Sequence, residues 1–223
     1  MPDDSYTKPQ FVSCHSTGEM FPFSEEILED AKRAYFVLKT ERARMDALLD
    51  IISIYRSVGR IDDLLEFCDS VVKDQKMSIC KPEILFRMGE ACSEVCRYDQ
   101  ALDFYLASAE FDSPSEQVRY CRLTGAAFCC LMKADPLKAQ ELCKSAIVIN
   151  PNQWVAWKDL GMSLELLDDT REAANCYARA IKLSNANVIP IVHMRELVKR
   201  RADGIRNLSE IRKELMENHG VLV

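Results

Sequence analysis

A spacing pattern that recurs along this 223-residue chain limits its possible folds more than any other feature. In the clearest copy, WKDLGMSLELLDDTREAANCYARAIKLS at 157–184, Gly161 is followed by Ala173, Tyr177 and Ala180. Two earlier copies begin at Gly89 and Gly125, and a weaker one has Ile52 in the glycine place. The residues that follow in these three copies are Ala101, Tyr105 and Ser108; Ala139, Cys143 and Ala146; and Leu64, Cys68 and Val71.

Each copy predicts two antiparallel helices joined by a short turn. Turn signals fall at VGR, RYD, KADP and LDD, and the KADP copy carries two extra residues at that point. A small residue is expected where the two helices cross closely, and aromatic residues are expected between one hairpin and the next. One hairpin cannot bury both of its faces, so neighbouring hairpins must stack into a solenoid.

The composition agrees with a helical fold. Only 7 Gly and 8 Pro occur, whereas folds rich in strands and loops need such turn residues at frequent intervals. Hydrophobic residues make up 48% of the chain, which is enough for a buried core. The predicted fold class is therefore all-α, an α-solenoid of stacked helix–turn–helix hairpins with flanking capping helices.

The same patterns predict how the chain is divided. Ser24 is a good N-cap, with Glu25 and Glu26 in the first turn that follows. Pro190 suits a first helical turn, and Gly204 separates two C-terminal helical segments. The predicted parts are an extended N-terminal arm at 1–22, a helix at 23–44, four repeats at about 45–81, 82–117, 118–153 and 154–187, and C-terminal capping helices at 188–223.

The four copies resemble the tetratricopeptide repeat family. The best match is WVAWKDLGMSLELLDDTREAANCYARAIKLS, with its Trp, Leu-Gly, Ala, Tyr and Ala, and the preceding INPN resembles the link between such repeats. The first copy departs from the family at Ile52 and Leu64, where Gly and Ala are usual. The resemblance implies a scaffold in which the first helix of each hairpin lines a groove for a peptide segment or a partner's helix.

Placing that groove on this sequence gives candidate binding residues. Four basic residues form a possible cluster in its middle, and arginine forks pair well with carboxylates, so an acidic segment is one expected ligand. The alternative is a solvated charged face whose arginines pair with Glu90 and Asp159 of the same chain. The candidate groove residues are Phe86, Arg87, Glu90, Arg119, Arg122, Lys158, Asp159 and Met162.

Other classes of function find little support in the residues. The net charge of −6 disfavours nucleic acid, whose phosphates need basic partners. Neither a phosphate-binding loop, a nucleophile elbow nor a zinc-protease motif occurs, and the 10 Cys form no Cys-x-x-Cys pair. Acidic pairs such as Asp168–Asp169 fall in turns, where they favour helix starts. We therefore expect no enzyme, no cofactor and no metal, and mostly buried, reduced thiols.

The sequence also bears on location and partners. MPDDSY is not a signal-peptide start, and no apolar run reaches the length of a membrane span, so a cytoplasmic protein is expected. The basic run KRR at 199–201 is either a solvated helix face or a contact for an acidic partner or membrane surface. The leading interpretation is a protein-binding adaptor of unspecified oligomeric state. A secretion-type chaperone for an unfolded client and a regulatory subunit of an enzyme assembly are the alternatives.

Overall fold

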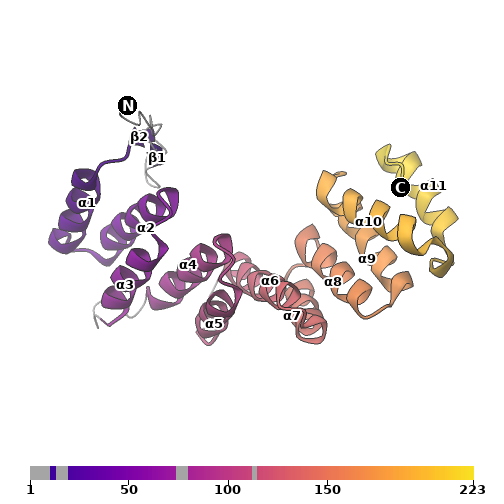
Figure 1. Cartoon of the computed structure of the whole chain (residues 1–223), viewed down its shortest axis with the longest axis horizontal. Helices are drawn as coiled ribbons and strands as arrows, with labels where there is room; N and C mark the ends of the chain where they lie inside the picture. The colour runs from indigo at the N-terminus through magenta and orange to yellow at the C-terminus, as the bar shows by residue number, and fades with distance from the viewer. Residues whose placement is uncertain (1–10, 14–19, 74–79, 112–114) are drawn as a thin grey trace, which may run out of the picture. The chain divides into compact units, whose positions relative to one another are not determined.

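The computed structural model of the chain describes residues 11–13, 20–73, 80–111 and 115–223, and these form two compact units. The first unit spans residues 1–92 and the second spans 93–223. The helices are α1 Glu25–Val37, α2 Glu41–Ser57, α3 Ile61–Val72, α4 Lys81–Glu94, α5 Tyr98–Ala109, α6 Glu116–Met132, α7 Pro136–Ile149, α8 Trp154–Leu166, α9 Thr170–Leu183, α10 Val188–Arg201 and α11 Leu208–His219, with a short 3₁₀ helix η2 at Ala202–Gly204 (Figure 1).

Most consecutive helices pack against each other within each unit. In the first unit α2 packs against both α1 and α3. In the second unit α6 packs against α7 and α8 against α9, while α7–α8 and α9–α10 contacts join successive hairpins (Figure 1). The predicted fold class, an all-α solenoid of stacked helix–turn–helix hairpins, is confirmed.

The N-terminal region adds a short ribbon that the sequence pattern did not indicate. Strand β1, Phe11–Ser13, pairs antiparallel with β2, Met20–Pro22, so that Val12 lies opposite Phe21. The backbone of β1 lies against α2. Residues 1–10 and 14–19 of the expected arm lie outside the described residues.

The helix expected over 23–44 is two helices. Helix α1 begins after Ser24, whose Oγ accepts a hydrogen bond from Ile27 N at 3.3 Å, and it ends at Val37. Leu38 then takes an extended conformation, and Thr40 caps α2 by accepting from Ala43 N at 3.3 Å. The capping threonine followed by Glu41 is a helix-start signal that the apolar periodicity alone obscured.

The turns inside the hairpins share one backbone conformation. Gly59, Cys96, Ala134 and Asp168 all have left-handed φ angles, of 73°, 60°, 56° and 64°. In three of these turns the residue after the left-handed one donates its backbone N–H to a carbonyl five residues back, as in Asp169 N to Leu164 O at 2.9 Å. This satisfies carbonyls that the end of each first helix would otherwise leave unpaired.

The repeated glycines make room for aromatic rings. A Cβ added at Gly161 would stand 2.6 Å from the ring of Tyr177, and one at Gly125 would stand 2.6 Å from the ring of Tyr105. The sequence argument attributed these glycines to the close approach of two backbones. The structure corrects the reason, because the atoms that exclude a side chain belong to a tyrosine ring.

The C-terminal segments extend the core of the second unit. Asn187 caps α10 by accepting from Ile189 N at 2.9 Å, and Gly220 ends α11 with φ 63°. The residues that join α10, α11 and the terminus to the core of α8 and α9 include Met194, Leu197, Ile211, Leu215, Val221 and Val223. The last helices are thus packed parts of the second unit.

Candidate functional site

The predicted groove residues fall in both units. Phe86, Arg87 and Glu90 lie on α4 in the first unit. Arg119 and Arg122 lie on α6, and Lys158, Asp159 and Met162 on α8, in the second unit.

On α4 the arginine is held by carboxylates of its own unit. Arg87 Nε lies 2.9 Å from Glu83 Oε1, and its Nη1 lies 2.9 Å from Glu90 Oε2. Glu90 also approaches Arg56 Nη1 at 3.6 Å, and the Arg87 guanidinium stands 5.3 Å from the centroid of the Phe86 ring. Two arginines therefore face two glutamates, which corresponds to the charged face with internal ion pairs. Phe86 is itself buried, with 7% of its surface exposed.

On α6 the two arginines occupy different environments. Arg122 is 3% exposed and donates through Nη1 to the carbonyl of Phe111 at 3.2 Å. A ligand could reach this guanidinium only by displacing the side chains that bury it. Arg122 therefore has a structural role beneath the surface of α6. Arg119 is only half-buried.

On α8 a lysine and an aspartate form a largely buried ion pair. Lys158 Nζ lies 2.5 Å from Asp159 Oδ1, and the two side chains are 12% and 2% exposed. Burial raises the pKa of Asp159 above its usual value, and the neighbouring Lys158 opposes that rise. The Lys158 ammonium also stands 5.9 Å from the centroid of the Phe128 ring. The pair thus lies within the packed contact between α6 and α8.

Tyr120 ties α6 to the beginning of α8. Its hydroxyl accepts a hydrogen bond from Ala156 N at 2.9 Å and lies 3.4 Å from the carbonyl oxygen of Gln153. The ring is buried, and burial raises the pKa of Tyr120 to about 12. The hydroxyl therefore stays protonated, and its two backbone contacts hold the turn before α8 in place.

A polar network between α8, α9 and α10 escaped the sequence analysis. Tyr177 donates its hydroxyl to Glu165 Oε2 at 2.9 Å, and Arg200 Nη2 lies 2.5 Å from Glu165 Oε1. His193 stacks on the Tyr177 ring with centroids 5.6 Å apart, and burial together with Lys158 lowers the pKa of His193. No local spacing signals this network, because Glu165 and Arg200 meet only in the folded chain.

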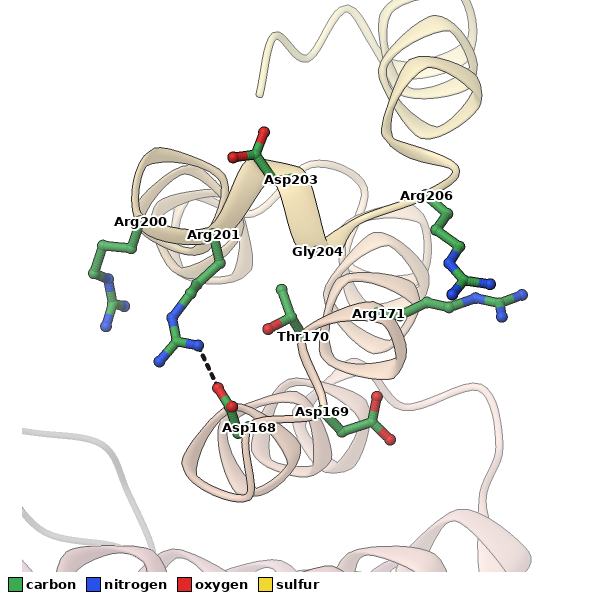
Figure 2. A pocket seen from close by; sticks show the side chains of 9 residues that line it. All are labelled: Asp168, Asp169, Thr170, Arg171, Arg200, Arg201, Asp203, Gly204 and Arg206. Atoms are coloured by element: carbon green, nitrogen blue, oxygen red, sulfur yellow. Dashed lines mark hydrogen bonds and ion pairs between the residues drawn. The ribbon is translucent and has the colours of Figure 1, made fainter.

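A second feature is a cavity of about 580 Å³ between the α8–α9 turn and η2, which we name the arginine cavity (Figure 2). Two of its arginines, Arg200 and Arg201, come from the basic run at 199–201. The lining residues are Asp168, Asp169, Thr170, Arg171, Arg200, Arg201, Asp203, Gly204 and Arg206.

The acidic pair in this turn has structural roles. Asp169 Oδ1 accepts from Glu172 N at 3.2 Å and caps α9, while Asp168 forms an ion pair with Arg201. The sequence reading of these carboxylates as turn residues agrees with both contacts.

The described residues also bear on the expectations for thiols, metal sites and membrane-spanning helices. Among the described residues nine cysteines are free thiols; six of them are buried, and Cys96 is exposed. Within the same residues, no group of three or more His, Cys, Asp or Glu side chains is arranged to hold a metal ion. None of the described helices combines the length and hydrophobicity of a membrane span.

Comparison with known proteins places the fold. No protein-family model matches the chain, and no curated protein is significantly similar in sequence. The first tetratricopeptide repeat domain of human RPAP3 is 21% identical, with a TM-score of 0.51 over 56% of this chain and 94% of that domain.

Two further solved structures match over longer stretches. The MamA RS-1 ArsTM double mutant is 16% identical, with a TM-score of 0.60 over 76% of this chain and 91% of that protein. PilF of Pseudomonas aeruginosa is 16% identical, with a TM-score of 0.58 over 86% of this chain and 94% of that protein. The chain therefore has the fold of the tetratricopeptide repeat domains.

Proposed function

We propose that the chain is a non-enzymatic protein–protein interaction scaffold. Its proposed binding surface is the first-helix face of the second unit, defined by α6, α8 and α10. Helix α6 lies against α8, and α8 lies against α10, so these three helices adjoin in series. The ligand class is a peptide segment or a single helix of a partner protein.

One observation carries this proposal: α10 exposes apolar side chains close to one another. Val188, Ile189 and Val192 are 66%, 47% and 49% exposed. They follow i, i+1, i+4 spacing and therefore share one side of the helix. The opposite side is packed, since Met194 and Leu197 are fully buried. Single exposed apolar residues are common, but a group on one helix face favours docking of an apolar partner surface.

Charged and polarisable residues would complete the surface. Half-buried Arg119 on α6 offers a cation to an acidic segment, and Met162 on α8 offers an adaptable apolar contact. Lys158 contributes through the small exposed part of its side chain.

The test compares exposed positions of the same residue type. A protein captured from the source cells by the tagged chain would be identified by mass spectrometry, and its binding segment titrated calorimetrically. Val192→Asp should weaken that segment's binding by about tenfold or more, because it places a charge in an apolar contact. Arg119→Glu should weaken binding of an acidic segment to a similar degree.

Matched controls lie away from the first-helix face. Val148 on α7 is 85% exposed, so Val148→Asp introduces the same charge on a second helix. Arg179→Glu on α9 plays the same part for Arg119→Glu. Equal weakening by the control variants, or no captured segment that binds when purified, would refute this surface.

A further inference from the structure

We propose that the arginine cavity is a separate binding site for a phosphate group, either as free phosphate or as a phosphate monoester on a partner. The proposal concerns a different part of the second unit from the first-helix face. It rests on the cavity, on the four arginines among its lining residues, and on the unequal way in which those arginines are neutralised.

The arginines reach the cavity from three segments. Arg200 and Arg201 end α10, Arg171 lies in the first turn of α9, and Arg206 follows η2. Figure 2 shows the side chains of Arg200 and Arg201 to the left of Thr170, and those of Arg171 and Arg206 to its right. Residues this far apart in the sequence meet here because η2 turns the chain back over the start of α9.

Two of the four arginines are held in place by carboxylates. Arg200 pairs with Glu165 at 2.5 Å, and Arg201 pairs with Asp168 (Figure 2). These pairs fix two guanidinium groups at the rim, yet the side chains remain 59% and 56% exposed. A guanidinium has five N–H donors, so an arginine with one carboxylate partner keeps others for a ligand.

The other two arginines are less fully paired. Within the described part of the chain, Arg206 has no side-chain ion pair or hydrogen bond, and Arg171 only approaches its neighbour Glu172 at 4.0 Å. Asp203 is the nearby carboxylate without an ion pair among the described residues, while Asp169 is occupied with the cap of α9. The lining as a whole holds four arginines and three aspartates.

The shape of the cavity favours a group larger than a single water. Its volume is about 580 Å³, and it opens to the surface. In its lining Gly204 lies close to Thr170, since an added Cβ would lie 3.2 Å from Thr170 Cγ2. A phosphate carries about −1.5 to −2 charges at pH 7 and has three strong acceptor oxygens, which match several guanidinium forks better than one carboxylate does.

The experiment titrates the full chain with inorganic phosphate and, separately, with O-phosphoserine, while sodium chloride keeps the ionic strength constant. Amide signals of Thr170 and Arg171 in a ¹H–¹⁵N spectrum report on the cavity. We expect saturable shifts that weaken from about pH 7.5 to about pH 5.5, since the second pKa of a phosphate is about 6. Tighter binding of O-phosphoserine would identify a phosphorylated partner, and tighter binding of inorganic phosphate a free anion.

Variants that should change phosphate binding in opposite directions make the test specific. Arg171→Gln with Arg206→Gln should weaken binding about tenfold or more, because two charge-assisted contacts are lost. Asp203→Asn should strengthen it, because a repelling charge is removed. Arg179→Gln, a change at an exposed position of α9 outside the cavity, should leave binding unchanged, and tryptophan fluorescence would verify that each variant is folded.

Several results would overturn the proposal. They are shifts that chloride alone reproduces, shifts that do not saturate, and affinities that the Arg171 and Arg206 substitutions leave unaltered. An equal loss in the Arg179 variant would show a non-specific charge effect and would equally reject the site. None of these readouts depends on the first-helix face, so the two proposals can fail independently.

Discussion

The hairpins α8–α9 and α2–α3 occupy corresponding places in the repeat pattern but fill their interiors differently. In α8–α9 the first helix contributes Gly161 and the second contributes the fully buried Tyr177. In α2–α3 the same two places hold Ile52 and Cys68, 2% and 0% exposed. One hairpin joins the smallest residue to a large ring, and the other joins two residues of intermediate size.

In α8–α9 the two places share a volume, because the ring of Tyr177 fills the space over Gly161. A glycine is required where a ring lies so close, whereas α2–α3 combines a buried isoleucine with a buried cysteine at the same two places. The same relation holds at Gly125 in a neighbouring hairpin, where the ring of Tyr105 of α5 fills the space that a side chain would need. Protein interiors are packed closely enough that such exchanges must be reciprocal.

The largest expected effect comes from removing the large member of each pair. Tyr177→Ala should lower the free energy of unfolding by about 3–5 kcal/mol, because a buried ring is lost and a cavity remains. Cys68→Ala should cost only about 1 kcal/mol, since a single buried heavy atom, the sulfur, is removed.

Native probes allow each hairpin to be followed separately. Trp154 and Trp157 both lie in α8, so tryptophan fluorescence during denaturation reports on the second unit. Amide hydrogen exchange in α2 and α3 reports on the first unit. Equal losses from the two substitutions would show that the pairs do not differ as described.

An intermediate effect is expected from one methyl group added or removed at the other member of each pair. Gly161→Ala should destabilise the second unit by about 1–3 kcal/mol, because the new Cβ meets the Tyr177 ring. In an open helix the same change would stabilise by about 1 kcal/mol, so the sign is diagnostic. Ile52→Val should cost about 0.5–1.5 kcal/mol by leaving a small void.

A double-mutant cycle isolates the contact at Gly161. In a Tyr177→Leu background, Gly161→Ala should lower the free energy of unfolding far less, since the smaller leucine leaves room for the added methyl group. Additive effects in denaturant titrations would contradict the proposed clash.

The smallest effect concerns the turns of two hairpins. Gly59→Ala should cost about 1 kcal/mol, although nothing lies within 4 Å of the added Cβ, because the left-handed φ of 73° disfavours alanine. Ala134→Gly, at φ 56°, should stabilise its turn by up to about 1 kcal/mol for the same reason. Calorimetric melting of both variants checks the pair, and shifts in the same direction would exclude the backbone explanation.

The sequence predicted the helical hairpins well because their signals are local. Capping residues, turn residues and apolar spacing each act within a few positions, so Ser24 and Asp169 could be interpreted directly. The break after Val37 was missed, although Thr40 followed by Glu41 is a local helix-start signal.

The candidate site was less accessible to sequence reasoning. Eight groove residues were chosen by their places in the repeat, but exposure depends on what packs above each one. Phe86, Arg122 and Asp159 are buried by neighbouring elements, whereas Arg119 and Met162 keep part of their surface. The sequence shows which residues are charged, but it does not show which residues they pair with.

By itself, the sequence determined that paired helices form and stack, because each hairpin carries its own starts, turns and apolar stripe. Only the tertiary structure decided that a tyrosine ring fills the space over Gly161, that Lys158 is committed to Asp159, and that four arginines share a cavity with the α8–α9 turn. The reason is physical: helix formation depends on contacts within a few residues, whereas burial and charge pairing depend on groups brought together from distant parts of the chain.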